Sequence, residues 1–204
     1  MEIFFVRHGQ TGGNVAKRHQ AEHSSLSFEG EEQVRVVAEK IKEYEPTHLV
    51  TSNLVRALET SREIAAVCCL TPETRSEFME LRRPDKLYGN FHFSVLSLTY
   101  YFKWFFGIET GPLKNGETYD ELLERIKKAK SYLAELPADS RVIVVSHSVF
   151  IIFFLAHLCD EEKMSLPKAM LTFRKLNLMK NTEITRVLFD PNTRSGTCSW
   201  VISI

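Results

Sequence analysis

Short apolar runs alternate along the chain with stretches of helical periodicity. The runs are rich in β-branched and aromatic residues and show little polar alternation, which is typical of strands buried on both faces. They predict strands over residues 3–6, 48–51, 141–146, 172–178, 184–189 and 199–204, and a brief strand around Thr74. Strands that alternate with helices indicate a layered α/β fold with a mostly parallel sheet, in which one of the last strands can be antiparallel.

Apolar residues spaced three and four positions apart indicate the helices between these strands. Ser27 is a suitable N-cap for the first helix, and Pro46 ends it. The inward residues of this helix are predicted to be Val34, Val37, Ala38 and Ile41. A second helix, capped by Ser52, is predicted to turn inward Leu54, Leu58 and Ala65.

Two further helices are indicated in the second half of the chain. Gly116 and Glu117 introduce an amphipathic helix that Pro137 ends. Its apolar face is predicted to hold Tyr119, Leu122, Leu123, Ile126, Ala129 and Leu133. Residues 147–159 are largely apolar and predict a buried helix.

The composition fits one domain with a substantial core. The 204 residues are 44% hydrophobic, and 26 basic side chains balance 26 acidic ones, so the formal net charge is zero. This balance gives no indication of nucleic-acid binding. Polar side chains interrupt the apolar stretches 142–159 and 91–108, so we expect no transmembrane segment. The second stretch is rich in Phe, Tyr and Trp, and it predicts a lid over an active site or a partner surface.

The cysteines carry little signal of their own. Cys68, Cys69, Cys159 and Cys198 include no C-x-x-C pair, and a chain of this size needs no disulfide, so we expect buried free thiols. The first residues lack the basic start and apolar segment of a signal peptide, and a cytoplasmic location is therefore expected. Assembly as a homodimer is a further expectation.

Two histidines directly follow predicted buried strands, where layered α/β proteins bind ligands. His8 comes after Arg7, whose planar guanidinium suits phosphate. His147 begins a helix with Ser148, and the backbone N–H groups of a helix N-terminus favour anions. Arg56 lies in the first turn after another predicted strand. The spacing alone favours an anion site and ordinary capped strand ends about equally.

The stretch from Arg7 to Asn14, RHGQTGGN, resembles the opening R-H-G-x-T/S signature of the histidine phosphatase superfamily, whose fold is phosphoglycerate mutase-like. Four more segments resemble the family's motifs in the correct order: Leu26–Gly30 with Gln33, Ser52 with Arg56, Ala57 and Thr60, Phe78–Glu80, and Val145–His147. The resemblance implies a three-layer α/β/α fold with a mostly parallel central sheet. It implies a single domain over residues 1–204, with a helical, aromatic-rich cap insertion at about 91–116.

The resemblance also implies roles for individual residues. His8 would be the nucleophile that accepts the phosphoryl group as a phosphohistidine. Glu80 would protonate the leaving-group oxygen and then activate water, with Glu77 as the rival acid. The groups around the phosphoryl oxygens would be Arg7, Arg56, His147, Asn14 and the backbone at Ser148. Neither a metal nor another cofactor is implied.

Several departures from the family pattern bear on the activity. Ser148 stands where the family often has glycine, and the basic segment 81–89 stands where many members have a Gly-rich acidic one. That segment either binds a further anionic group of the substrate or is a solvated loop. Gly13 replaces an aromatic residue common in phosphoglycerate mutases, and the chain is shorter than a typical mutase, which favours a phosphatase.

The function expected from these observations is that of a metal-independent phosphomonoesterase. Its substrate would be a small phosphorylated metabolite, of apolar or ring character because the predicted cap is aromatic. The alternatives are a phosphoglycerate-type mutase and a non-catalytic module on the same fold that binds a phospho-ligand or a protein.

Overall fold

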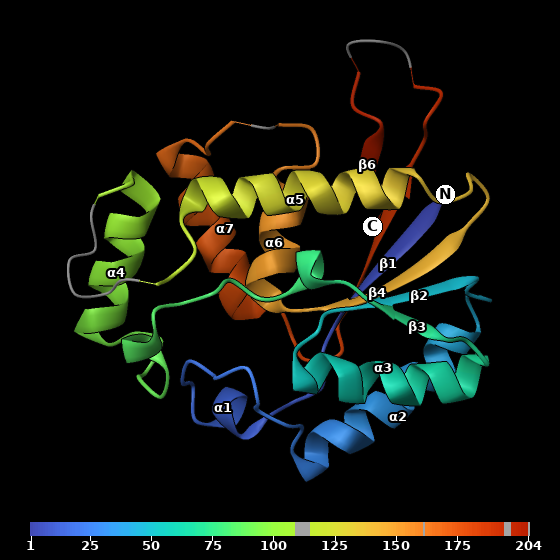
Figure 1. Cartoon of the computed structure of the whole chain (residues 1–204), viewed down its shortest axis with the longest axis horizontal. Helices are drawn as coiled ribbons and strands as arrows, with labels where there is room; N and C mark the ends of the chain where they lie inside the picture. Colours follow the sequence, from blue (N-terminus) through green and yellow to red (C-terminus); the bar gives the residue numbers. More distant parts are fainter. Residues whose placement is uncertain (109–114, 161, 194–196, 204) are drawn as a thin grey trace.

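The computed structural model describes residues 1–108, 115–160, 162–193 and 197–203, and in these ranges six strands form one sheet (Figure 1). The strands are β1 (Glu2–Arg7), β2 (His48–Thr51), β3 (Pro72–Thr74), β4 (Arg141–Ser146), β5 (Ile184–Phe189) and β6 (Trp200–Ser203). Their order is β3-β2-β4-β1-β5-β6. The first four strands in this order run parallel, whereas β5 pairs antiparallel with both β1 and β6. The sheet is therefore mostly parallel, as predicted.

The helices connect and cover these strands. They are α1 (Gly12–Val15), α2 (Phe28–Lys42), α3 (Val55–Cys68), α4 (Val95–Phe106), α5 (Tyr119–Ala134), α6 (Ser148–Ala156) and α7 (Leu166–Leu178). Two short 3₁₀ turns, η1 (Ser76–Phe78) and η2 (Asp85–Leu87), lie between β3 and α4. No helix in the described ranges is long and apolar enough to cross a membrane.

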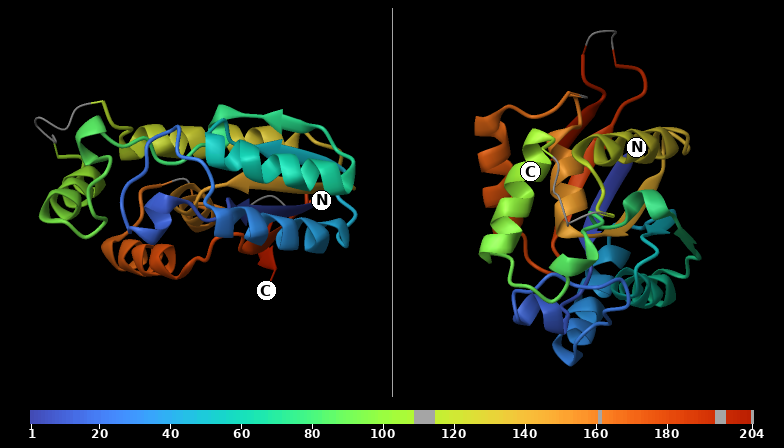
Figure 2. Two further views of the ribbon diagram at one scale, coloured as in Figure 1. Left: turned by 90° about the horizontal axis from the view of Figure 1, so that it is seen from below. Right: turned by 60° about the vertical axis from the view of Figure 1, so that its left-hand side comes forward.

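Alternation along the central strands produces the three layers. Phe4 and Val6 of β1 pack in a cluster with residues of α2 and α3, while Ile3 and Phe5 pack in a second cluster with α5 and α6. Successive side chains of a strand point to opposite faces, so a strand without polar residues fills a core on each side. Figures 1 and 2 show α2 and α3 on one face and α5 and α6 on the other.

The two amphipathic helices bury the predicted faces. Ser27 accepts a hydrogen bond from the Gly30 N–H at 3.1 Å and caps α2, which buries Val34, Val37, Ala38 and Ile41. Thr118 and Glu121 form a capping box at the start of α5. The buried residues of α5 are Tyr119, Leu122, Leu123, Ile126, Ala129 and Leu133.

Two predictions about secondary structure are wrong. Residues 172–178 lie in α7, not in a strand, because Ala169, Thr172 and Leu176 follow helical spacing in a segment that continues from Leu166. In α3 the N-cap is Leu54, not the predicted Ser52. Leu54 is buried as predicted, whereas the other predicted inward residues, Leu58 and Ala65, are only half-buried. The face that α3 buries holds Arg56, Ala57, Thr60, Ser61 and Ile64, since this helix turns polar groups toward the end of the sheet.

The expectation of four buried free thiols is also wrong. Cys159 and Cys198 form a disulfide with their Cα atoms 5.2 Å apart, although 39 positions separate them in sequence. The return of the chain through β5 and the segment before β6 brings Cys198 beside Cys159, three residues after the end of α6. Cys68 and Cys69 are free, but the first is half-buried and the second is exposed.

The strand register brings the predicted site residues to one edge of the sheet. Arg7 pairs with Ser146 across β1 and β4, and Thr51 pairs with Val145 across β2 and β4. The residues directly after these strands are therefore neighbours at the carboxyl edge. Beyond this edge lie α4 and α7, at the end of the molecule seen on the left in Figures 1 and 2. Within the predicted cap, α4 and the segment before it are described, and residues 109–114 lie outside the described ranges.

Candidate active site

The loop that holds His8 packs tightly against the start of α2. A Cβ atom on Gly9 would lie 2.7 Å from the Gly30 carbonyl oxygen, and one on Gly30 would lie 2.0 Å from that of Gln10. Only glycine permits such a close approach of two backbones. The pair explains why the segments RHG and LSFEG must occur together.

The imidazole of His8 is buried and held in one orientation. Its Nδ1 atom lies 2.7 Å from the Gly9 carbonyl oxygen, which can only accept, so Nδ1 holds the proton. The Arg56 Nε–H donates to the other ring nitrogen, Nε2, at 3.3 Å. Burial, followed by the positive charges of Arg56 and Arg7, holds the pKa of His8 well below 6.5. The ring is therefore neutral, with an unprotonated Nε2.

The second histidine lies beside the first. The His147 ring centroid is 5.1 Å from that of His8, and its Nε2 atom lies 2.8 Å from the Ser52 hydroxyl oxygen. Its Nδ1 atom is buried without a hydrogen-bond partner. Burial and the charge of Arg56 lower the pKa of His147 well below its usual range, so this ring is also neutral. A buried ring nitrogen without a partner is uncommon, and here it leaves an unused hydrogen-bonding group beside His8.

Two guanidiniums stand at the same end of the site. Arg7 donates to the Met179 carbonyl oxygen, and its Nε is buried without a partner. Arg56 donates from a terminal nitrogen to the Ala21 carbonyl oxygen at 3.2 Å. In the described part of the chain, neither arginine forms an ion pair with a carboxylate. Burial lowers the pKa of Arg56 to about 10, which leaves it charged at neutral pH.

The two candidate acids are separated clearly. Glu80 is only 8% exposed and lines the cavity described below. Its carboxylate accepts hydrogen bonds from the N–H groups of Leu81 at 2.8 Å, Phe150 at 3.3 Å and Val149 at 3.4 Å. Glu77 instead pairs with Arg75 at 3.3 Å and is absent from the cavity lining.

Asn14 and Ser148 both line the cavity, as expected of phosphate-binding groups. The Asn14 Oδ1 atom accepts hydrogen bonds from the Thr11 N–H at 3.1 Å and from Asn181 Nδ2 at 3.2 Å. Asn181 also donates to the His8 carbonyl oxygen at 3.0 Å. Sequence reasoning missed Asn181, because nothing local marks a single asparagine between α7 and β5. It also treated Ser52 only as a helix cap and motif residue, whereas its hydroxyl contacts His147.

These groups open into a cavity of about 680 Å³. One end is polar and holds Arg7, His8, Asn14, Arg56, Glu80 and Ser148. The other end is largely apolar and is walled by residues of α4 and α7, among them Leu98, Phe102, Trp104, Leu166, Met170 and Phe173. His147 is fully buried and does not reach the cavity wall. The described residues contain no group of three or more His, Cys, Asp or Glu side chains that could hold a metal ion.

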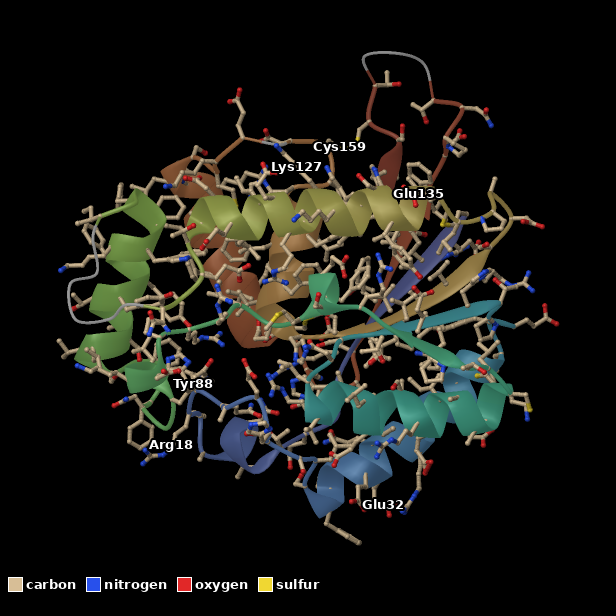
Figure 3. All side chains as sticks on the ribbon, in the orientation of Figure 1. Arg18, Glu32, Tyr88, Lys127, Glu135 and Cys159 are labelled. Atoms are coloured by element: carbon tan, nitrogen blue, oxygen red, sulfur yellow. A yellow bond between two sulfur atoms is a disulfide. The ribbon has the colours of Figure 1, made fainter. Side chains whose placement is uncertain are left out.

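A second region of positive charge lies at the side of the cavity. The segment after α1 pairs with the segment after η2: the Gly89 N–H donates to His19 and the His92 N–H to Lys17. Arg18 stacks over the Phe91 ring and donates to the Gly89 carbonyl oxygen. Figure 3 shows Arg18 and Tyr88 together at this end of the molecule, below α4.

Comparisons with known proteins agree with this geometry. The family model of the histidine phosphatase superfamily (branch 1) matches residues 3–198. A probable phosphoglycerate mutase, GpmB, from Photorhabdus laumondii is 34% identical over 160 residues, which cover 73% of this chain and 70% of that protein. Its counterpart from Enterobacter sp. is 33% identical over 157 residues, with the same shares covered.

Solved structures share the fold over the whole chain. A mycobacterial glucosyl-3-phosphoglycerate phosphatase matches with a TM-score of 0.72 and 21% identity, covering 100% of this chain and 97% of that one. A phosphoserine phosphatase mutant from Entamoeba histolytica matches with a TM-score of 0.71 and 19% identity, covering 100% and 95%. At these sequence identities, the similarity to solved structures shows a shared fold only. Membership of the family is shown by the match to the family model. The chain belongs to branch 1 of the histidine phosphatase superfamily.

Proposed function

We propose that this protein is a metal-independent phosphomonoesterase that transfers the phosphoryl group of a small phosphorylated metabolite to His8 Nε2. The observation that supports it most directly is the state of the His8 ring. Its Nδ1 proton is engaged by the Gly9 carbonyl oxygen, and its pKa is held well below 6.5 by burial. The Nε2 lone pair is thus unprotonated at neutral pH and accepts a hydrogen bond from the Arg56 Nε–H, which would turn to the phosphoryl oxygens when the substrate binds.

The surrounding groups suit a transferring phosphoryl group. The oxygens of that group would accept from the Arg7 Nε–H, which is buried without a partner, and from Arg56. Neither arginine forms an ion pair with a carboxylate among the described residues. His147 would contribute its Nδ1–H in the tautomer in which the Ser52 hydroxyl donates to Nε2. Phosphoryl transfer has a loose transition state, so positioning and charge stabilisation provide most of the catalysis.

Glu80 is the proposed acid and base. In the first step its carboxyl proton passes to the leaving-group oxygen as the P–O ester bond breaks and the bond from phosphorus to His8 Nε2 forms. In the second step the carboxylate takes a proton from water, which attacks phosphorus and releases phosphate and the imidazole. Three backbone N–H groups hold the side chain at the cavity wall, and they favour the carboxylate, the form that acts as the base in the second step.

The apolar end of the cavity supports a leaving group with apolar or ring character. Residues of α4 and α7 form this wall, which is consistent with the predicted cap over residues 91–116. Exposed apolar side chains on the same helices, including Val95, Leu171 and Leu178, are compatible with the expected homodimer. We also retain the cytoplasm as the proposed location.

Hydrolysis of an aryl phosphate by purified protein tests the proposal. The wild type should release phosphate and form an acid-labile phosphohistidine that rapid quenching with ³²P-labelled substrate detects. The variant His8→Ala should lose both the label and at least a thousandfold in kcat, because the covalent route needs the ring nitrogen. Turnover that survives His8→Ala would sink the proposed nucleophile.

A phosphoglycerate-type mutase is the second candidate, since the sequence relatives have that name. A mutase keeps the phosphoryl group and excludes water, whereas a phosphatase admits it. Interconversion of 2- and 3-phosphoglycerate without net phosphate release would favour the mutase. Binding of phosphate esters without either reaction would instead indicate a non-catalytic module, for which the set Arg7, His8, Arg56, Glu80 and His147 has no evident need.

A further inference from the structure

Arg83 is a buried cation in the cavity that the proposed transfer reaction does not use. It lies three residues after Glu80, in the basic segment that replaces the family's Gly-rich acidic one. Its side chain is one of the cavity-lining groups, and the residue is only 8% exposed. The neighbouring Arg82, in contrast, is exposed and does not line this cavity.

The partners of Arg83 are neutral. Its Nε–H donates to the Tyr101 hydroxyl at 2.6 Å, and one terminal nitrogen donates to the Leu81 carbonyl oxygen at 3.4 Å. A guanidinium has five N–H donors, so several remain for a ligand. In the described part of the chain, no carboxylate forms an ion pair with Arg83. A buried charge is costly unless an opposite charge approaches it. Glu80 acts on Arg83 without forming an ion pair with it, so the guanidinium still favours an anion in direct contact.

The cavity as a whole contains more positive than negative charge. Its lining includes the basic side chains Arg7, Lys17, Arg18, Arg56 and Arg83. Among the described residues, Glu80 is the one acidic side chain in that lining. A phosphoryl dianion would offset Arg7 and Arg56. Burial disfavours the charged form of Arg83, but Tyr101 and Glu80 raise its pKa and the guanidinium stays protonated. The single charge of Glu80 also acts on Arg7 and Arg56, so a dianion bound to those two arginines leaves Arg83 without an anion in direct contact.

Tyr101 fixes where this charge acts. The tyrosine belongs to α4, lines the cavity, and lies with its ring centroid 6.1 Å from that of Phe173 on α7. Arg83 is therefore held between the phosphoryl end, which Glu80 borders, and the apolar wall. A group bound there belongs to the leaving part of the substrate, because the transferred phosphoryl group occupies the His8 end.

We propose that Arg83, positioned by Tyr101, binds a second anionic group on the leaving part of the substrate. The preferred substrates are then phosphomonoesters that have a carboxylate or a second phosphate close to the ester oxygen. This inference rests on the proposed function for the position of the phosphoryl group. Its subsite, however, is defined by Arg83 and is testable by binding alone.

The test measures dissociation constants by calorimetry in a His8→Ala background, which prevents turnover. One ligand pair is 3-phosphoglycerate against glycerol 3-phosphate, and the other is glycerol 1,3-bisphosphate against glycerol 3-phosphate. In at least one pair, we expect the ligand with the second anionic group to bind at least ten times more tightly than the ligand without it. The pair that shows the preference identifies carboxylate or phosphate as the second group.

Substitution of Arg83 should remove that preference. Arg83→Met should lower the ratio of affinities within the preferred pair at least tenfold, Arg83→Lys should lower it less, and Arg82→Met should leave it unchanged. Equal affinity for both members of each pair in the His8→Ala background alone would overturn the proposal, whether or not Arg83→Met folds. So would an unchanged ratio in a folded Arg83→Met variant. Failure of the proposed function is distinct: no ester is hydrolysed by the wild type, while the binding ratios still report on Arg83.

Discussion

His8 illustrates how burial and one backbone carbonyl produce a nucleophile. An exposed histidine titrates near 6.5 and spends much of its time protonated in weakly acidic solution. Here the Gly9 carbonyl oxygen engages Nδ1, and burial disfavours the imidazolium. The arginines needed for phosphate binding act in the same direction, since a second positive charge beside Arg56 is unfavourable. The groups that attract the substrate thus also keep the nucleophile unprotonated.

Stability should depend on pH because of these buried histidines. The folded-state pKa values of His8 and His147 lie below the unfolded value of about 6.5, so the unfolded chain binds more protons as the pH falls. The contribution of these two histidines to the free energy of unfolding should therefore be fully present above about pH 6.5. Below that pH it should decrease by up to about 1.4 kcal/mol per pH unit for each histidine. Urea unfolding between pH 7.5 and 5 measures this slope.

The matched variants separate this effect from general acid lability. His147→Gln should flatten the slope, whereas His23→Gln, which changes an exposed residue, should not. A slope that is identical in the wild type and His147→Gln would contradict the assignment.

Because His8 stays neutral, its protonation should not reduce kcat/KM at pH 6, where an ordinary histidine would be mostly charged.

At the scale of elements, amphipathic periodicity was a reliable predictor where a helix packs along one face of the sheet. The buried positions of α2 and α5 match the predicted sets because each helix has one apolar stripe and one solvated face. The prediction failed for α7, whose short window of apolar and Thr residues at 172–178 resembles a strand. It also failed in part for α3, because the buried face of that helix includes the polar residues Arg56 and Thr60, which lie at the candidate site and not in the apolar core.

The aromatic helix α4 should control which leaving groups are accepted. Phe102 lines the cavity although 60% of its surface is exposed. Removal of the ring should therefore weaken the binding of apolar substrates without loss of core packing. Phe102→Ala should lower kcat/KM for 1-naphthyl phosphate relative to glycerol 3-phosphate about tenfold, equivalent to about 1.4 kcal/mol. Phe28→Ala, on α2 and outside the cavity, is the matched control. An unchanged ratio in Phe102→Ala would argue against an apolar leaving-group site.

At the scale of the whole molecule, the Cys159–Cys198 disulfide joins the segment before β6 to the segment after α6. A cross-link that closes a loop of 39 positions stabilises a fold by about 3–4 kcal/mol, mainly through the unfolded chain. Cys198→Ser should therefore lower the melting temperature by an amount on the order of 10 °C. Dithiothreitol should lower the melting temperature of the wild type by a similar amount and leave the melting temperature of the variant unchanged.

A free cysteine provides the control for this measurement. Cys68→Ser changes a thiol outside the disulfide and should retain the response to dithiothreitol. If reductant has no effect on the wild type, the bond contributes nothing to stability. Disulfides persist mainly in oxidising compartments, so thiol trapping in freshly lysed cells also tests the proposed cytoplasmic location.

Local sequence determined the α/β alternation, the aromatic character of residues 91–108 and the six predicted residues at the polar end of the cavity: Arg7, His8, Asn14, Arg56, Glu80 and Ser148. This is possible because periodicity, turn residues and the motif around His8 are properties of a few adjacent positions. The juxtapositions were decided only by the tertiary structure. Examples are Asn181 on the His8 carbonyl, Ser52 on His147, Arg83 on Tyr101 and the disulfide to Cys198. Each joins segments far apart in the chain, and sheet register and helix packing, rather than neighbouring residues, set the distance between them.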